Sequence, residues 1–303
     1  MLRGGFRGSL EEGIPLAGFT TFRIGGPAGL LARPQGTGDL GLLLEAVAAS
    51  QERLLVLGKG SNVLISDQGF DGVVAVLSGG LGRITKDSKD KVYVESGCDL
   101  NMLVRWVIER DLGGLEDLSG IPGSVGGAVR MNAGAMGASI GDRVERVDVM
   151  RLAGAVVETK EMKRRDMGFE YRRSGLEDGD IICGIWLKLE PAAGDALKSR
   201  RREVMRWRRE NQPLRQPSAG SVFRNPPGAA AGELIDRCGL KGMRMGEAMV
   251  SDKHANFIVN TGGARADDVH ALMMRVKEEV KRREGIELEE EIRLVGVMGE
   301  GGR

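Results

Sequence analysis

The sequence predicts an α+β protein of about two domains. Its 303 residues exceed the roughly 150 that a typical domain contains. Short apolar runs dominate the chain up to about residue 198, whereas helical and strand patterns mix after it. The helices and strands do not alternate as simple βαβ units would require. We therefore expect a strand-rich first part and a mixed second part, with a boundary near residue 198.

The first hundred residues predict one helix and several buried strands. Residues 1–15 form an expected mobile lead-in without regular structure. Leu40, Leu43, Leu44 and Val47 recur at helical spacing and predict a helix over 38–52. Short apolar runs closed by Gly, Asp or Ser predict strands at 54–57, 63–65, 73–77 and 92–94.

A second helix is expected over 99–112. Asp99 is a suitable N-cap, and the apolar residues that follow it share one helical face. The glycine-rich stretch 113–141 has no helical or strand period. Strands are predicted again at 144–150 and 181–189.

The second part begins with a basic helical segment at 196–212, which Pro213 ends. Such a segment suits either RNA binding or a solvated face between domains, and we favour the solvated face. A strand is predicted at 256–259. Residues 267–284 predict an amphipathic helix, with Gly285 as its C-cap.

Composition excludes several classes of protein. The formal net charge is +1 and aromatic residues make up 4%, which argues against a nucleic-acid binder. Three scattered cysteines support neither a disulfide framework nor a metal site. No apolar run suits a membrane helix or signal peptide, so we expect a cytoplasmic protein. Glycine is the outlier, with 47 residues, about twice the usual ~7%.

One glycine loop lies between two predicted strands. Its sequence is Gly58-Lys59-Gly60-Ser61-Asn62, and successive N–H groups in such a loop can bind an anion. The spacing matches neither a P-loop nor a Rossmann fingerprint. A plain turn between strands is the alternative.

A longer glycine loop covers residues 120–128, GIPGSVGGA, and no charged residue occurs from 118 to 129. A neutral, glycine-dense backbone suits contact with a flat ligand that carries a phosphate end. A buried crossing of chain segments is the alternative. The two loops are predicted to form two walls of one nucleotide-cofactor site. Asparagine is scarce, yet five of its seven residues lie in similar motif-like strings: Asn62, Asn132, Asn225, Asn256 and Asn260.

Seven strings in order carry a family resemblance. They are TTFRIGG (20–26), LGKGSNVLISDQGFDGVV (57–74), GIPGSVGGAVRMNAG (120–134), YRRS (171–174), AGSVFRNP (219–226), SDKHANFIVN (251–260) and LEEEIRLVG (288–296). The chain resembles the UDP-N-acetylenolpyruvoylglucosamine reductase family of flavoenzymes in peptidoglycan synthesis. The short interval between Tyr171 and Ser221 resembles the type II subclass.

The resemblance implies a two-lobed FAD-binding domain of the vanillyl-alcohol-oxidase (PCMH) type and a smaller α+β substrate-binding domain. The lobes would span 1–78 and 79–198, with 290–303 returning to the FAD domain, and the substrate domain 199–289. The only histidines, His254 and His270, lie outside both glycine loops, so we expect non-covalent FAD. The implied FAD-binding residues are Gly58, Lys59, Gly60, Ser61, Asn62, Gly120, Ile121, Pro122, Gly123, Ser124, Gly126, Gly127 and Asn132.

The implied reaction is reduction of FAD by NADPH, followed by reduction of the enolpyruvyl sugar nucleotide to UDP-N-acetylmuramate. Ser221 matches the family's proton donor. Arg172 matches the arginine that binds the substrate carboxylate, and Glu291 the glutamate that works with it. Expected substrate contacts are Tyr171, Arg224, Asn225 and Lys241.

Two other functions stay open at this point. One is an FAD oxidase or dehydrogenase of the same superfamily that acts on another small alcohol. The other is a non-catalytic nucleotide-binding module. The expected partners are NADPH and the UDP-sugar, with no metal, nucleic acid, membrane or obligatory protein partner.

Overall fold

The computed structural model describes residues 5–154, 156–296 and 298. The chain divides into two compact units. Unit 1 holds the described residues within Met1–Glu12, Leu30–Lys59 and Gly72–Trp207. Unit 2 holds those within Gly13–Gly29, Gly60–Asp71 and Arg208–Arg303. The mixture of helices and strands confirms the α+β class, whereas the division into lobes and a substrate domain stays a prediction.

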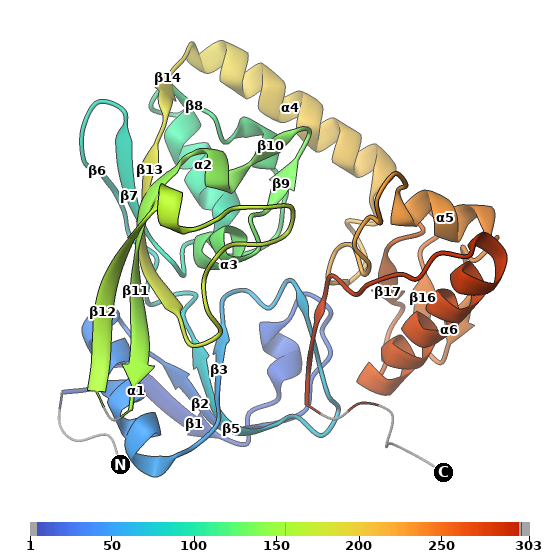
Figure 1. Ribbon diagram of the computed structural model, residues 1–303, viewed down its shortest axis with the longest axis horizontal. Coiled ribbons are helices and arrows are strands. Elements are labelled where there is room, and N and C mark those ends of the chain that lie inside the picture. The colour runs from blue at the N-terminus through green and yellow to red at the C-terminus, as the bar shows by residue number, and fades with distance from the viewer. Residues whose placement is uncertain (1–4, 155, 297, 299–303) are drawn as a thin grey trace. The chain divides into compact units, whose positions relative to one another are not determined.

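The largest sheet of unit 1 is five-stranded and antiparallel (Figure 1), in the order β12-β11-β13-β7-β6. Its strands are β6 (Ile84–Lys86), β7 (Lys91–Glu95), β11 (Val144–Ala153), β12 (Val156–Lys163) and β13 (Ile181–Lys188). Val147 and Val149 of β11 and Ile185 of β13 are buried, because alternate side chains of a strand face the same side of the sheet.

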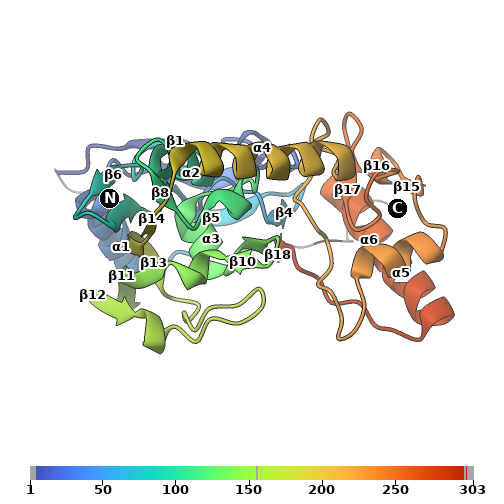
Figure 2. The same cartoon turned by 90° about the horizontal axis from the view of Figure 1, so that it is seen from above.

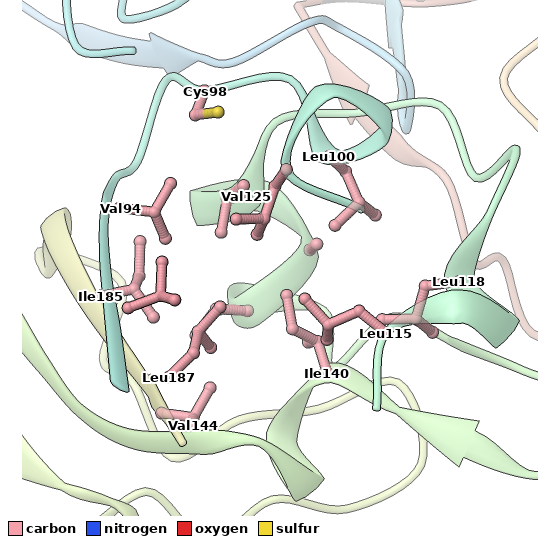
Figure 3. Packing of buried hydrophobic residues seen from close by; sticks show 14 of the residues in the cluster. Val94, Cys98, Leu100, Leu115, Leu118, Val125, Ile140, Val144, Ile185 and Leu187 are labelled. Atoms are coloured by element: carbon pink, nitrogen blue, oxygen red, sulfur yellow. The ribbon is translucent and has the colours of Figure 1, made fainter. Parts of the chain in front are cut away.

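Two helices cover this sheet, α2 (Leu100–Ile108) and α3 (Val125–Arg130). Figure 3 shows Leu100 and Val125 in the same packed cluster as Val94 of β7 and Ile185 of β13. Burial of such apolar side chains contributes about 25 cal/mol per Å². This core fixes the N-terminal end of α3, where the second glycine loop lies.

A four-stranded sheet has the order β1-β2-β5-β3, with β3 parallel to β5. Its strands are β1 (Ser9–Glu12), β2 (Ala28–Arg33), β3 (Leu54–Leu57) and β5 (Phe70–Val76). Helix α1 (Thr37–Ser50) packs Leu43 and Val47 against its strands. Unit 1 also contains two short strand pairs: β8 (Leu112–Gly113) with β14 (Glu190–Pro191), and β9 (Gly134–Ala135) with β10 (Ala138–Ser139). Helix α4 (Gly194–Asn211) follows β14.

Unit 2 contains a three-stranded sheet of β15 (Arg244–Met245), β16 (Ala248–Val250) and β17 (Ile258–Asn260). Helix α6 (Ala266–Glu284) packs on β15 and β16 and contacts α5 (Ala231–Arg237), and Figures 1 and 2 both show α5 and α6 together. A parallel pair joins β18 (Arg293–Val295) to β4 (Val63–Ile65), so distant parts of the sequence lie side by side.

Most of the predicted elements are confirmed, with shifts of a few residues at their ends. Asp99 caps α2 by accepting the N–H of Met102 at 2.8 Å, and Gly285 ends α6 with φ 70°. The lead-in prediction is wrong for Ser9–Glu12, because these residues pair with β2. Residues 1–4 of that prediction lie outside the described residues. Strands β2, β6, β12, β16 and β18, the two-residue strands, and helices α3 and α5 were not predicted.

Candidate functional site

The two predicted glycine loops meet in unit 1. Gly58, at the end of β3, lies directly against Ser124, since a Cβ added at Gly58 would come within 2.0 Å of the Ser124 Oγ. Only a residue without a side chain leaves room for that contact. The expectation that the two loops come together is therefore met at these two residues.

The second loop is held by the side chain of Asn101, a residue that was not predicted to belong to the site. The N–H of Gly120 donates to its Oδ1 at 2.6 Å, and its Nδ2 donates to the Ile121 carbonyl at 2.9 Å. Asn101 lies within α2, so the core of unit 1 sets the position of the loop. No sequence signal pointed to it, because Asn101 lies outside every motif-like string.

The end of this loop carries backbone donors without acceptors. The Ser124 Oγ accepts the N–H of Gly127 at 3.3 Å and so caps α3. Within the described part of the chain, the buried N–H groups of Gly123 and Ser124 have no hydrogen-bond acceptor. Buried N–H groups are nearly always paired, so these two donors fit an anionic group such as a pyrophosphate.

Lys59, on the first loop, forms an ion pair with the α2 cap Asp99. Burial raises the pKa of Asp99, but the hydrogen bonds from Lys59 and from the Met102 N–H outweigh it, so the pKa lies below its ordinary value. A cavity of about 750 Å³ opens beside this pair and is also lined by Gly97 and Cys98. Burial raises the pKa of the Cys98 thiol to about 12, so this thiol is uncharged at neutral pH.

The first loop continues into unit 2 with residues 60–62. The Nδ2 of Asn62 donates to the backbone carbonyl of Glu291 at 3.0 Å, and the Asn62 carbonyl accepts the N–H of Arg293 at 2.9 Å. The sequence predicts that Asn62 binds the cofactor. The structure uses its side-chain amide to hold the backbone of the candidate catalytic glutamate.

Asn132 supports the segment that carries Tyr171 and Arg172. Its Nδ2 donates to the Glu170 carbonyl at 2.8 Å, and its Oδ1 accepts the N–H of Gly141 at 3.1 Å. Arg172 has a left-handed φ of 56°, a conformation that a non-glycine residue rarely adopts. Its guanidinium donates to the Gly134 carbonyl at 3.4 Å and lies 5.1 Å from the centre of the Tyr171 ring.

Ser221 begins a short extended segment in unit 2, residues 221–224, which we call the Ser221 segment. It follows Gly220, which has φ 77°, and it pairs with Phe257 as an isolated bridge. The next two side chains, Val222 and Phe223, are fully buried, whereas Ser221 and Arg224 on either side of them are partly exposed. The buried pair therefore anchors the segment and leaves the two candidate site residues accessible.

Glu291 lies beside this segment. Its backbone N–H donates to the Val222 carbonyl at 2.7 Å. The backbone N–H of Arg224 donates to the Glu289 carbonyl at 2.9 Å. The neighbouring Glu290 pairs with Lys277 at 2.5 Å. Burial raises the pKa of Glu290, but the Lys277 hydrogen bond outweighs it and leaves the pKa below its ordinary value. Glu290 is thus committed to an ion pair, while the backbone pairing brings Glu291 next to the Ser221 segment.

The remaining predicted substrate residues lie around α5. Asn225 accepts the N–H of Ala231 at 3.0 Å and fixes the start of the helix. Lys241 pairs with Asp236 at 2.6 Å. Among the residues that the structure describes, the buried Nε of Arg224 has no hydrogen-bond partner. An unpaired buried guanidinium N–H fits recognition of a carboxylate or phosphate.

The structure thus brings Ser221, Arg224 and Glu291 together in unit 2, and Gly58 and Ser124 together in unit 1. Arg172 belongs to unit 1. Across the described residues, no group of three or more His, Cys, Asp and Glu side chains is arranged to hold a metal ion. In the same residues, every helix is too short or too polar to span a bilayer.

Two known domain families match parts of this chain. Residues 28–160 match the FAD binding domain, and residues 212–295 match the C-terminal domain of UDP-N-acetylenolpyruvoylglucosamine reductase. The reductase of Chloroherpeton thalassium is 43% identical and covers 97% of this chain and 96% of its own length. That of Syntrophobacter fumaroxidans is 45% identical and covers 93% of this chain and 82% of its own length.

A solved structure is similar over nearly the whole chain. The crystal structure of UDP-N-acetylenolpyruvylglucosamine reductase from Thermus caldophilus superimposes with a TM-score of 0.81 at 38% identity. The match covers 96% of this chain and 100% of that one. The chain therefore belongs to the UDP-N-acetylenolpyruvoylglucosamine reductase family.

Proposed function

We propose that this protein uses NADPH and non-covalently bound FAD to reduce UDP-N-acetylenolpyruvoylglucosamine to UDP-N-acetylmuramate, in the cytoplasm, as a step of peptidoglycan precursor synthesis. Family membership over 97% of the chain supports the reaction. The observation that carries the site assignment is the backbone pairing of residues 222–224 with 289–291, which places Glu291 beside the Ser221 segment.

The residues of the two glycine loops fit FAD. Gly58 and Ser124 touch, and the N–H groups of Gly123 and Ser124 are buried donors for the pyrophosphate. The other residues proposed to contact FAD belong to the same two loops. Asn132, outside the loops, contributes by holding the backbone of Glu170 and Gly141. Bound FAD would supply the hydride chemistry that links NADPH to the enolpyruvyl double bond.

The side chains of the protein handle the proton and the charge. We assign Ser221 as the donor of a proton to the carbon that does not receive the hydride. A serine hydroxyl is a weak acid, so this transfer needs a strongly basic carbon and stabilisation of the negative charge on the substrate. Arg172 binds the substrate carboxylate, and Glu291 acts with it on the developing enolate.

Substrate binding is assigned to the cationic and polar residues near these groups. The Nε–H of Arg224, which has no partner among the described residues, is available for a phosphate or carboxylate oxygen. Lys241 contributes charge near α5, and Asn225 and Tyr171 contribute polar contacts. Because anions of this kind bind through charge-assisted hydrogen bonds, we expect affinity for the sugar nucleotide to fall with increasing salt.

The test is a spectroscopic titration of the purified yellow protein without oxygen. NADPH should bleach the flavin, and UDP-N-acetylenolpyruvoylglucosamine should restore its colour, while UDP-N-acetylglucosamine, which lacks the enolpyruvyl group, should not. Ser221→Ala should slow the return of colour by about 10²- to 10⁴-fold and leave the bleaching unchanged. Colour restored by oxygen but not by the enolpyruvyl sugar would instead indicate an oxidase of the same superfamily.

A further inference from the structure

Asn256 holds the Ser221 segment by its side chain. It is buried, with 4% of its surface exposed. Its Oδ1 accepts the N–H of Phe223 at 2.9 Å, and its Nδ2 donates to the carbonyl of the same residue at 2.8 Å. One side chain therefore satisfies both backbone groups of Phe223, as a neighbouring strand would.

The backbone of Asn256 extends this contact. Its carbonyl accepts the N–H of Val222 at 2.9 Å, and the next residue, Phe257, forms the bridge with Ser221. The other edge of the segment pairs with residues 289–291. The segment is thus fixed along both edges, and Asn256 supplies three of the hydrogen bonds on one of them.

The residue before Ser221 offers no such restraint. An added Cβ at Gly220 would meet no described atom within 4 Å, and φ there is 77°, so the backbone on this side is open and permissive. The direction of the Ser221 hydroxyl therefore depends on the hydrogen bonds that follow it. A proton donor must be placed accurately, because a displacement of about 1 Å can cost a factor of ~10² in rate.

We propose that Asn256 is a positioning residue for the reaction: it fixes the Ser221 hydroxyl in the orientation that protonates the substrate. This inference rests on the proposed function, in which Ser221 donates that proton. It assigns to Asn256 no contact with substrate or flavin.

The chain offers a matched control in Asn260, at the end of β17. Asn260 is also buried, with 7% of its surface exposed. Its Oδ1 accepts the N–H groups of Gly262, Gly263 and Ala264, and its Nδ2 donates to the Phe22 carbonyl at 3.1 Å. It has the same chemistry as Asn256, and in the described part of the chain it forms no hydrogen bond with the Ser221 segment.

The experiment compares Asn256→Ala, Asn260→Ala, Ser221→Ala and the double variant Asn256→Ala/Ser221→Ala, each loaded with FAD. Rapid mixing measures flavin reduction by NADPH and flavin reoxidation by the enolpyruvyl sugar separately. Asn256→Ala should slow reoxidation by about 10- to 100-fold and leave reduction unchanged. Asn260→Ala should lower the thermal midpoint without separating the two rates.

The double variant distinguishes positioning from general destabilisation. If Asn256 acts through Ser221, its removal has no further effect on reoxidation once Ser221 is gone, since coupled residues are not additive. A double variant slower than Ser221→Ala overturns the proposal, as does Asn256→Ala that slows both half-reactions equally. If Asn256→Ala does not fold, Asn256→Asp takes the place of the alanine variant in the same measurements, because aspartate keeps the acceptor for the Phe223 N–H.

The proposed function has its own point of failure in this set. If Ser221→Ala reoxidises at the wild-type rate, the assignment of Ser221 as proton donor is wrong. The proposal that Asn256 positions this donor is then wrong as well. If Ser221→Ala is slow and Asn256→Ala is not, the assignment of Ser221 stands and only the role of Asn256 is wrong.

Discussion

The side-chain amide of Asn62 donates a hydrogen bond to the backbone carbonyl of Glu291, 229 positions later in the sequence, at 3.0 Å. The parallel pairing of β4 with β18 starts one residue after Asn62 and two residues after Glu291, with Val63 opposite Arg293. The first glycine loop is therefore tied to the candidate catalytic glutamate through its last residue. The loop has a role in unit 2 as well as in unit 1.

Asn62→Ala should consequently impair the second half-reaction more than FAD binding. We expect flavin content to be retained and reoxidation by the sugar to slow by about ten-fold or more, because Glu291 loses one of its backbone restraints. The ratio of flavin to protein absorbance and the reoxidation rate check this. A colourless Asn62→Ala protein would instead show that the Asn62 side chain holds the cofactor, as the sequence predicts.

Gly58→Ala should reduce flavin content. The added Cβ would lie 2.0 Å from the Ser124 Oγ and 2.9 Å from its Cβ, so the two loops must separate, at a cost of about 1–3 kcal/mol. Gly41→Ala is the control, since a Cβ there meets no described atom within 4 Å and alanine stabilises a helix interior by ~1 kcal/mol relative to glycine. Thermal unfolding and absorbance after desalting measure both effects. Full flavin content in Gly58→Ala would contradict the contact between the loops.

Arg224→Ala should weaken binding of the sugar nucleotide. A hydrogen bond to a charged group contributes about 1.5–3 kcal/mol, which corresponds to roughly 10- to 100-fold in Kd. Titration of the flavin spectrum with the sugar nucleotide gives this value. Lys281→Ala serves as control, because Lys281 forms an exposed ion pair with Glu287 at 3.2 Å. Equal affinities in the two variants would rule out Arg224 as a substrate ligand.

The stability of unit 2 should depend on His254 in mildly acidic solution. Burial, and then the nearby Lys241, lower the pKa of His254 below its ordinary value of 6.5. Its Nδ1 accepts the N–H of Asn256 at 3.3 Å, which requires that nitrogen to be unprotonated. The unfolded chain therefore binds more protons, and the free energy of unfolding should decrease as the pH falls below about 6.5, until it passes the folded-state pKa.

Denaturant unfolding between pH 7.5 and about 5 measures this loss. His254→Gln removes the titrating group, so the variant should show a weaker decrease over the same range. If the two proteins lose stability in parallel, His254 is not the group responsible.

The sequence predicted elements whose determinants are local. Asp99 was identified as the cap of α2 because capping depends on residues within one turn, and α6 was identified from its apolar face and Gly285. Strand β12 was missed because its sequence, VVETKEMK, is largely exposed and charged and lacks the alternation of a half-buried strand. Helix α3 was missed because two of its six residues are glycine, which a helical pattern disfavours.

The same limit applies to the site. The glycine loops and the Ser221 string could be read from the sequence, because residue type and order carry their signal. The roles of Asn101 and Asn256 could not be read from the sequence. Asn101 binds backbone atoms about 20 positions away, and Asn256 binds backbone atoms 33 positions away. Asn101 lies outside every motif-like string, and the string around Asn256 does not show which distant backbone its side chain binds.

The path of the chain has a consequence for how the molecule can be made and altered. Its backbone passes from one unit to the other after Glu12, Gly29, Lys59, Asp71 and Trp207. Phe22 and Leu64, from the early segments, belong to the same buried cluster as Val269 of α6. A polypeptide that starts near residue 208 would lack these early side chains, so its core would contain a cavity. We expect neither part of the chain to fold when it is expressed alone. Exchange of the carboxy-terminal part between relatives would require exchange of the two short amino-terminal segments of unit 2 as well.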